Sequence, residues 1–255
     1  MRHSNVGRAM QESVYFYTFH KCASTLFSGH VLGNVRDLRH RDFARLIYDG
    51  NLREPVAFEE RGYVYGPIRL SLRPGGPVHE QLVSRAADAD FVRDRICVFL
   101  ARDPRDILVS RYHSLGFTHG LSPVGGIRRR QETARTEIRR MTLDEYALSQ
   151  AEAQRRDFAL MHELHAACSR SVLLRYEDLV DDFDRFARDL CRYLPLPART
   201  LRKIERSSRP RRRVDASRQR RSGRPGQFRE ALRAETVESL NGRLGGTLQL
   251  FGYAI

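Results

Sequence analysis

Residues 15–27 read YFYTFHKCASTLF, and this stretch decides the fold because its character changes at one point. The run up to Phe19 is aromatic and apolar, a pattern typical of a buried strand. From Ser24 onward the apolar residues have helical spacing, and the serine itself can cap a helix. The stretch therefore predicts a strand at 14–19, a tight loop and a helix.

Lys21 lies in that loop, and lysine is rare in this chain. Of the 45 Lys and Arg residues, only Lys21 and Lys203 are lysine. Lysine differs from arginine in being a compact point charge on a flexible stem. A lysine at this position therefore indicates a role that depends on lysine chemistry.

The composition fits a globular protein with one substantial core. The chain has 255 residues, of which 41% are hydrophobic, and we predict a single domain over residues 1–255. No apolar run approaches the about 20 residues of a membrane span, and the first residues lack the apolar segment of a secretory signal. The four cysteines lie far apart, which argues against a zinc site and for reduced thiols. We therefore expect a cytoplasmic protein without a metal.

The net charge of +14 is unevenly distributed. Residues 202–221 contain ten basic and two acidic residues. Such a segment can bind nucleic acid, an acidic membrane surface or a polyanionic small molecule, and it can equally be a solvated loop.

Strands and helices alternate along the chain, which predicts an α/β fold with a central, mostly parallel sheet flanked by helices on both faces. Such sheets bind ligands at the carboxyl ends of their strands. Further strands are expected at 62–70 (broken at Gly66-Pro67), 95–100 and 171–176. Helices are expected at 36–48, at 82–90, from Asp103-Pro104, at 142–167 with a Thr142–Glu145 capping box, at 177–193 and at 229–243. The arginine-rich stretches 128–140 and 202–221 are expected to be surface loops or lids.

The loop at 21–25 has the features of an anion site. A helix N-terminus offers unpaired N–H groups and the positive end of the helix dipole. The small residues let an anion approach the backbone, Ser24 and Thr25 offer hydroxyl donors, and Lys21 adds a mobile charge. The glycines of the triphosphate loop G-x-x-x-x-G-K-[ST] are absent. An ordinary capped helix with an exposed lysine would have the same residues, so this motif alone leaves both interpretations open.

Three later segments of the sequence favour the anion-site interpretation. In residues 98–113, VFLARDPRDILVSRYH, Arg102 follows a strand and Ser110 lies two turns into the next helix, so that both can bind one phosphate. Residues 174–182, LRYEDLVDD, again run from a strand end to a helix. Residues 221–230, RSGRPGQFRE, form a glycine-containing turn that can wrap around an anion.

In this order the four motifs resemble those of the sulfotransferases that use 3′-phosphoadenosine 5′-phosphosulfate (PAPS). HKCAST, RDPRDILVS, RYEDLVDD and RSGRPG are similar to that family's lysine loop, R-x-P-x-D-x-x-x-S stretch, Y-E-D-L segment and C-terminal R-x-G-x-x-G, and they extend from residue 20 to 226. The resemblance implies a sulfotransferase fold similar to that of P-loop NTPases. It also implies an enzyme that moves a sulfuryl group from PAPS to a hydroxyl or amine and releases adenosine 3′,5′-bisphosphate (PAP), without a metal.

The resemblance further implies roles for individual residues. Lys21 would bind the 5′-phosphosulfate and be catalytic, the pair Arg102 and Ser110 would bind the 3′-phosphate, and Tyr176 would lie near adenine. A basic loop, residues 202–226, would close on the 3′-phosphate. The implied cofactor-binding residues are Lys21, Cys22, Ala23, Ser24, Thr25, Arg102, Ser110, Tyr176, Arg221, Ser222 and Gly223. Phe228 stands where many relatives have tryptophan.

The general base and the acceptor are less clearly marked. Many relatives use a histidine, but the chain has no Lys-Thr-His stretch in the comparable region, residues 58–70. Glu60, beside Glu59, is the candidate base, although solvated surface acids would have the same sequence. His79 is a second candidate, whereas His20 and His113 are expected to position or pack.

The acceptor is expected to be a small molecule, a glycan or a lipid. Residues 116–140 are a candidate lid whose arginines would favour an anionic acceptor, and a solvated surface segment would have the same composition. Contact with a membrane surface is compatible with the charge, and the oligomeric state is not indicated. Two alternatives are a nucleotide-dependent kinase on a similar fold and an arginine-rich nucleic-acid-binding protein. We expect no stable nucleic-acid partner, since few aromatic residues lie among the arginines of 202–221.

Overall fold

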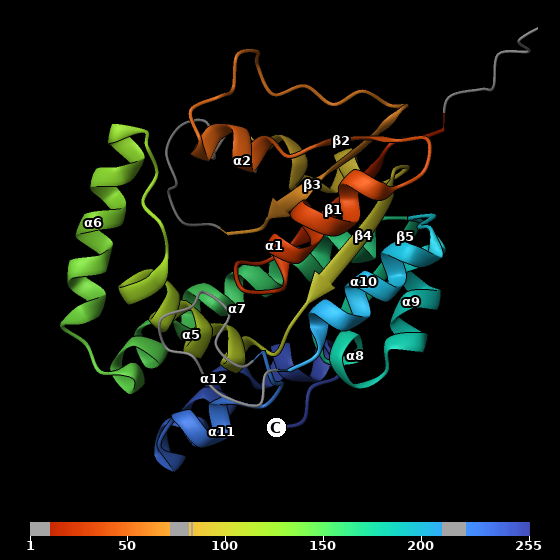
Figure 1. Ribbon diagram of the computed structural model, residues 1–255. Coiled ribbons are helices and arrows are strands. Elements are labelled where there is room, and N and C mark those ends of the chain that lie inside the picture. Colours follow the sequence, from red (N-terminus) through yellow and green to blue (C-terminus); the bar gives the residue numbers. More distant parts are fainter. Residues whose placement is uncertain (1–10, 72–81, 83, 211–222) are drawn as a thin grey trace, which may run out of the picture.

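A five-stranded sheet forms the centre of the chain in the computed structural model, which describes residues 11–71, 82, 84–210 and 223–255 (Figure 1). The strand order is β2-β3-β1-β4-β5, and every neighbouring pair is parallel. The strands are β1 (Val14–Thr18), β2 (Arg39–Arg41), β3 (Tyr63–Arg69), β4 (Ile96–Ala101) and β5 (Arg170–Arg175). The predicted α/β class with a parallel sheet is confirmed.

Helices cover both faces of this sheet (Figure 1). None of the described helices is both long and apolar enough to cross a membrane. In the first half of the chain the helices are α1 (Ser24–Leu26), α2 (Phe43–Tyr48), α4 (Ala89–Val92) and α5 (Pro104–His113). Helix α1 continues through a π-helical turn (Phe27–Val31) and a 3-10 turn (Leu32–Asn34), and α5 is followed by a π-helical turn (Ser114–Thr118). The later helices are α6 (Gly125–Arg139), α7 (Leu143–Ala167), α8 (Tyr176–Asp181), α9 (Phe183–Cys191), α10 (Ala198–Ser208), α11 (Phe228–Ala231) and α12 (Ala234–Leu250).

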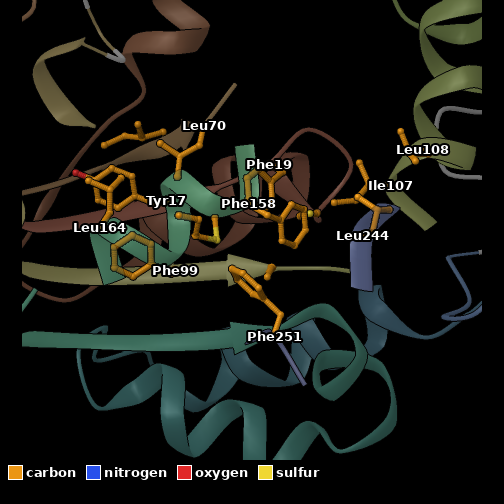
Figure 2. Close-up of a cluster of buried hydrophobic side chains, with 14 of the residues drawn as sticks. Tyr17, Phe19, Leu70, Phe99, Ile107, Leu108, Phe158, Leu164, Leu244 and Phe251 are labelled. Carbon is orange, nitrogen blue, oxygen red and sulfur yellow. The ribbon is translucent and has the colours of Figure 1, made fainter. Parts of the chain in front are cut away.

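The central strands are buried on both faces. On one face Tyr17 packs in a cluster with Phe158 of α7 and Leu244 of α12, as Figure 2 shows. On the other face Phe16 stacks on Phe27, with 4.4 Å between the ring centroids, inside a second cluster. Because neighbouring strand residues point to opposite faces, a strand between two cores reads as a continuous apolar run.

Capping residues begin two helices where the sequence predicts them. Asp103 precedes Pro104, and its carboxylate accepts the backbone N–H of Arg105 at 2.9 Å. At the start of α7, the side chains of Thr142 and Glu145 each accept the other residue's backbone N–H, so the predicted capping box is present.

Two predicted helices are interrupted by an aspartate. Within 36–48, residues 39–41 instead pair with β3 as an edge strand, and α2 begins only after Asp42, which accepts the N–H of Arg45 at 2.9 Å. Within 177–193, Asp182 ends α8 and caps α9. In both places the aspartate side chain satisfies helix N–H groups from a non-helical backbone, which favours a new start over continuation.

Other predicted elements also differ. The helix expected at 229–243 is divided into α11 and α12, and β3 continues through Gly66-Pro67 instead of breaking there. At Gly66 the φ angle is 140° and an added Cβ would lie 2.6 Å from the carbonyl oxygen of Phe16, so glycine is required for close strand packing.

The two arginine-rich stretches are largely helical where they are described. Of the stretch 128–140, predicted as a surface loop or lid, residues 128–139 belong to α6. The Nε–H groups of Arg135 and Arg139 donate to the carbonyls of Leu115 and Gly116 at 3.2 and 2.8 Å. Of 202–221, residues 202–208 belong to α10, and residues 211–222 lie outside the described part of the chain.

Candidate functional site

The loop that follows β1 has an unusual backbone. Lys21 and Ala23 have φ angles of 72° and 53°, in the left-handed region that residues other than glycine seldom occupy. Such strain is typical of functional loops. Two left-handed residues before the first helical residue, Ser24, turn the loop sharply into the helix, where leading N–H groups have no partner within the helix. Ser24 is buried and Thr25 is exposed.

Arg102, which directly follows β4, contacts this loop. Its Nη1 donates to the carbonyl oxygen of Lys21 at 3.2 Å, and its Nη2 lies 3.4 Å from both the Asp106 carboxylate and the carbonyl oxygen of Arg224. The side chain is almost fully buried, and its Nε has no hydrogen-bond partner among the described residues. The structure therefore brings together Lys21 and Arg102, the two cations that the resemblance assigned to one ligand.

Asp106 connects Arg102 to the C-terminal segment, residues 223–228. Its two carboxylate oxygens accept the backbone N–H groups of Gly226 and Phe228 at 2.8 and 3.0 Å. Burial raises the pKa of this carboxyl group, and the charge of Arg102 opposes that rise. Residues 223–228 are thus held against the first turns of α5.

Ser110 and Tyr176 are the next two residues that the resemblance assigned to the cofactor. Ser110 follows Asp106 by four residues in α5, so these two residues lie on the same face of that helix. The Tyr176 hydroxyl donates to the carbonyl oxygen of Gly223 at 2.7 Å. Its ring stacks under the Arg102 guanidinium, 4.4 Å from the centroid.

Glu177, beside Tyr176, was not singled out from the sequence. Its carboxylate accepts the N–H of Asp103 at 3.0 Å and the hydroxyl of Tyr253 at 3.2 Å. Burial raises its pKa to about 7. The residue ties α8 and the C-terminal residues to the start of α5, and its place within the Y-E-D-L segment was the available sequence signal.

Positive charge is concentrated around the lysine loop. Burial, and then the charge of Arg102, lower the pKa of Lys21 to about 8. Arg69, the last residue of β3, pairs with Thr18 beside the loop, and its Nε is buried without a partner among the described residues. Three cations gathered at one edge of the sheet create a positive potential there, which favours an anionic ligand.

Two histidines stand beside these cations. The rings of His20 and His119 have centroids 5.8 Å apart. Burial is the largest cause of a lowered pKa for both, followed for His119 by the charges of Lys21 and Arg69, and the pKa of His119 is about 4. His119 was not identified from the sequence, since nothing in the segment GFTHG connects it with a loop about 100 residues earlier.

The structure does not place Glu60, the candidate base, near the loop that contains Lys21. The carbonyl oxygen of Glu60 accepts the N–H of Ser13, which precedes β1, whereas Lys21 follows the end of β1. Five strand residues at about 3.3 Å each separate the two edges of the sheet. Glu59 lies on the Glu60 side too, so both carboxylates are far from the lysine loop.

The other predicted residues are placed as follows. His113 ends α5 and its ring lies against Tyr112, so it packs within its own helix as expected. Phe228 is buried under the guanidinium of Arg105, 4.1 Å from its ring centroid. Gly223 is described, with a left-handed φ of 73°, whereas Arg221, Ser222 and His79 lie outside the described residues.

Comparison with solved structures finds the same fold in mouse sulfotransferase SULT7A1 complexed with PAP. The two chains are 13% identical and superpose with a TM-score of 0.56 over 93% of this chain and 84% of the other. Two structures of retinol dehydratase, with androsterone and inactive cofactor PAP or with retinol and PAP, each cover 93% of this chain. They cover 80% and 81% of their own chains, at 17% and 15% identity and TM-scores of 0.43 and 0.45. No family model and no curated protein matches the sequence. The chain has the sulfotransferase fold, as the resemblance of its motifs implied.

From the contacts of Asp106 we predict that this residue stabilises the folded protein. Asp106→Asn leaves Arg102 without its buried ion pair and weakens the acceptor for two N–H groups. We expect a loss of about 3 kcal/mol in the free energy of unfolding, the scale for breaking a buried pair. Denaturant titration measures this loss, and amide exchange at Gly226 and Phe228 should accelerate. Asp49→Asn, which removes a surface partner of Arg45, should change stability by less than about 1 kcal/mol. Equal losses in both variants, with unchanged exchange at Gly226, would contradict this role of Asp106.

Proposed function

We propose that the chain is a sulfotransferase that moves a sulfuryl group from PAPS to an acceptor hydroxyl or amine. The observation that carries the proposal is the contact between Lys21 and Arg102 at the carboxyl ends of β1 and β4, in a fold that mouse SULT7A1 shares in complex with PAP. In parallel α/β sheets this edge is where ligands bind. A doubly phosphorylated nucleotide supplies two anionic groups for the two cations.

The residues present fit such a ligand. Lys21 and the backbone of residues 22–25 would hold the 5′-phosphosulfate, and Arg102 and Ser110 would hold the 3′-phosphate. The unpartnered Nε of Arg102 is a buried donor that a phosphate oxygen would satisfy. Tyr176 and the backbone of residues 223–226 would cover the nucleotide on the side of the 3′-phosphate, because the hydroxyl of Tyr176 already binds the carbonyl oxygen of Gly223.

When bound, PAPS supplies the sulfuryl group, and PAP is the other product. Lys21 stabilises the negative charge that develops on the phosphate side, since a positive charge already in place there needs no reorganisation. A lysine suits this task because its ammonium is a compact point charge. The acceptor needs a base close to the lysine, and among the described residues the two histidines, His20 and His119, lie there.

The two alternative functions, a nucleotide-dependent kinase and a nucleic-acid-binding protein, require different ligands. A kinase would bind a triphosphate with magnesium through a glycine-containing loop, and the strained loop at Lys21 has no glycine. A nucleic-acid-binding protein would bind any polynucleotide with a steep dependence on salt. Neither explains why the C-terminal segment is tied to Arg102 and Asp106.

Thermal unfolding with added nucleotide separates the three functions. PAP at about a hundred times its dissociation constant should raise the Tm by roughly 5–10 °C, since binding at that excess stabilises by about 2.7 kcal/mol. ATP with magnesium, and a single-stranded oligonucleotide, serve as controls and should give smaller shifts. A larger shift with ATP and magnesium would support the kinase, and a shift with the oligonucleotide alone would support nucleic-acid binding.

The lowered pKa of Lys21 predicts how PAP affinity depends on pH. Below about pH 8 the ammonium is charged in the free protein, so affinity should change little with Lys21 titration. Above that pH the free protein loses the proton, and a bound phosphate favours the charged form, so binding requires proton uptake. We expect affinity, measured calorimetrically, to fall by up to about tenfold per pH unit above pH 8.

Two arginine variants control for this effect. Lys21→Arg keeps its charge at pH 9 and should lose the pH dependence even if its affinity differs. Lys203→Arg, on the exposed surface of α10, should keep the wild-type profile. The same slope in all three proteins would show that Lys21 does not bind the phosphate.

A further inference from the structure

Helices α5 and α7 pack against each other, and the surface between them, the α5–α7 seam, contains polar side chains (Figure 1). At one end of the seam the Nη1 of Arg111 in α5 donates to the Oε1 of Gln154 in α7 at 3.1 Å. One turn further along α7, Phe158 stacks on Phe19, which directly precedes the lysine loop, with 4.3 Å between the ring centroids. The end of the seam at Arg111 therefore lies close to the lysine loop.

The seam holds most of the buried side-chain atoms that have no hydrogen-bond partner among the described residues. Five of these eight atoms belong to it, namely Arg111 Nε, Ser114 Oγ, Tyr146 OH, Gln150 Oε1 and Gln154 Nε2. The three residues of α7 follow one another at intervals of four, so they form one stripe along that helix. Buried polar groups are normally hydrogen-bonded, and a cluster of unsatisfied ones indicates that bound water or a bound ion completes the seam.

The chemistry of these atoms favours an anion over water alone. Arg111 carries a permanent positive charge and is only 6% exposed, and a buried cation is costly unless an anion lies against it. The amide nitrogen of Gln154 and the hydroxyls of Ser114 and Tyr146 can also donate, whereas the oxygen of Gln150 can only accept. The seam thus offers more donors than acceptors, with a full positive charge among them.

Neither of the two buried carboxylates on these helices forms an ion pair with Arg111. Asp106, five residues earlier in α5, pairs with Arg102 and accepts the N–H groups of Gly226 and Phe228. Asp157, three residues after Gln154 in α7, is buried, but it makes no ion pair with Arg111. The described residues therefore do not supply a counter-ion in contact with this guanidinium.

We infer that the α5–α7 seam binds a small monovalent anion such as chloride, held by the Nε–H of Arg111 and the amide N–H groups of Gln154. One guanidinium supplies one positive charge, which matches a monovalent ion. Ordered water in the same seam satisfies the hydroxyls of Ser114 and Tyr146 and the oxygen of Gln150. Because the side chains around it are almost fully buried, the site admits an ion of about the size of a water molecule and excludes a nucleotide.

The position of the seam connects this ion with the lysine loop. Burial, and then the charges of Arg69 and Arg111, lower the pKa of the His20 imidazole well below its ordinary value, so the field of Arg111 reaches the loop. An anion against Arg111 reduces this positive potential and also removes the cost of an uncompensated buried charge. The bound ion is therefore expected to stabilise the folded protein.

Thermal unfolding in increasing sodium chloride tests the site, with sodium gluconate replacing chloride so that the ionic strength stays constant. Gluconate is too large for the seam. Chloride at about ten times its dissociation constant should raise the Tm by roughly 3–6 °C, and the effect should saturate. A Tm that does not depend on chloride would overturn the inference.

Gln154→Glu provides the sharpest variant, because it places a carboxylate of the same size beside Arg111 and so supplies the counter-charge within the protein. The Tm of this variant should no longer depend on chloride. Gln249→Glu makes the same change at an exposed residue of α12 and should keep the chloride dependence of the wild type. An equal dependence on chloride in both variants would show that the ion does not bind at Arg111.

Crystals of the wild-type protein, grown without chloride and soaked in sodium bromide, locate the ion even if the variant does not fold. We expect an anomalous bromine peak in contact with Arg111 Nε and Gln154 Nε2. Water alone in the seam, or bromide only at Lys21 and Arg102, would overturn this inference. Neither result would bear on the proposed sulfotransferase activity, which is tested by the binding of PAP.

Discussion

The side chain of Arg102 is the contact on which the site depends, because three segments far apart in sequence meet at its guanidinium. It donates to the backbone of the lysine loop at Lys21, to Asp106 in α5 and to Arg224 in the C-terminal segment. Arginine suits this position since its planar fork can serve several acceptors at once. A buried charge with only long hydrogen bonds and one unsatisfied nitrogen is costly, so the arrangement is poised for a further acceptor.

The same constraint shapes the chemistry around it. Lys21, Arg69 and Arg102 are gathered at the carboxyl edge of the sheet, and the buried Asp106 is occupied by backbone N–H groups as well as by Arg102. Burial, and then the neighbouring positive charges, lower the pKa values of His119 and Lys21. We propose that a bound polyanion offsets the contribution of the neighbouring charges, so that the pKa values of Lys21 and His119 rise when the nucleotide binds.

Local signals in the sequence were sufficient for much of this structure. The strand–loop–helix unit at Lys21, the capped start of α5 and the capping box of α7 all follow from residues adjacent in sequence. The meeting of Lys21 with Arg102 also followed, because both come after parallel strands that pair with each other. Long-range placement was harder. Glu60 could not be assigned to the far edge of the sheet without knowing where β3 begins, and His119 reaches the site only because α6 holds the segment after α5 in place. The aspartates that divide predicted helices show that a cap can outweigh continued apolar spacing.

The most direct test of the central claim is a crystal structure of the protein with PAP. We predict the 5′-phosphate within hydrogen-bond distance of the Lys21 ammonium and the 3′-phosphate against the Arg102 guanidinium, with the adenosine between them beside Tyr176. PAP bound elsewhere, or bound with only one of these two cations in contact, would contradict the account.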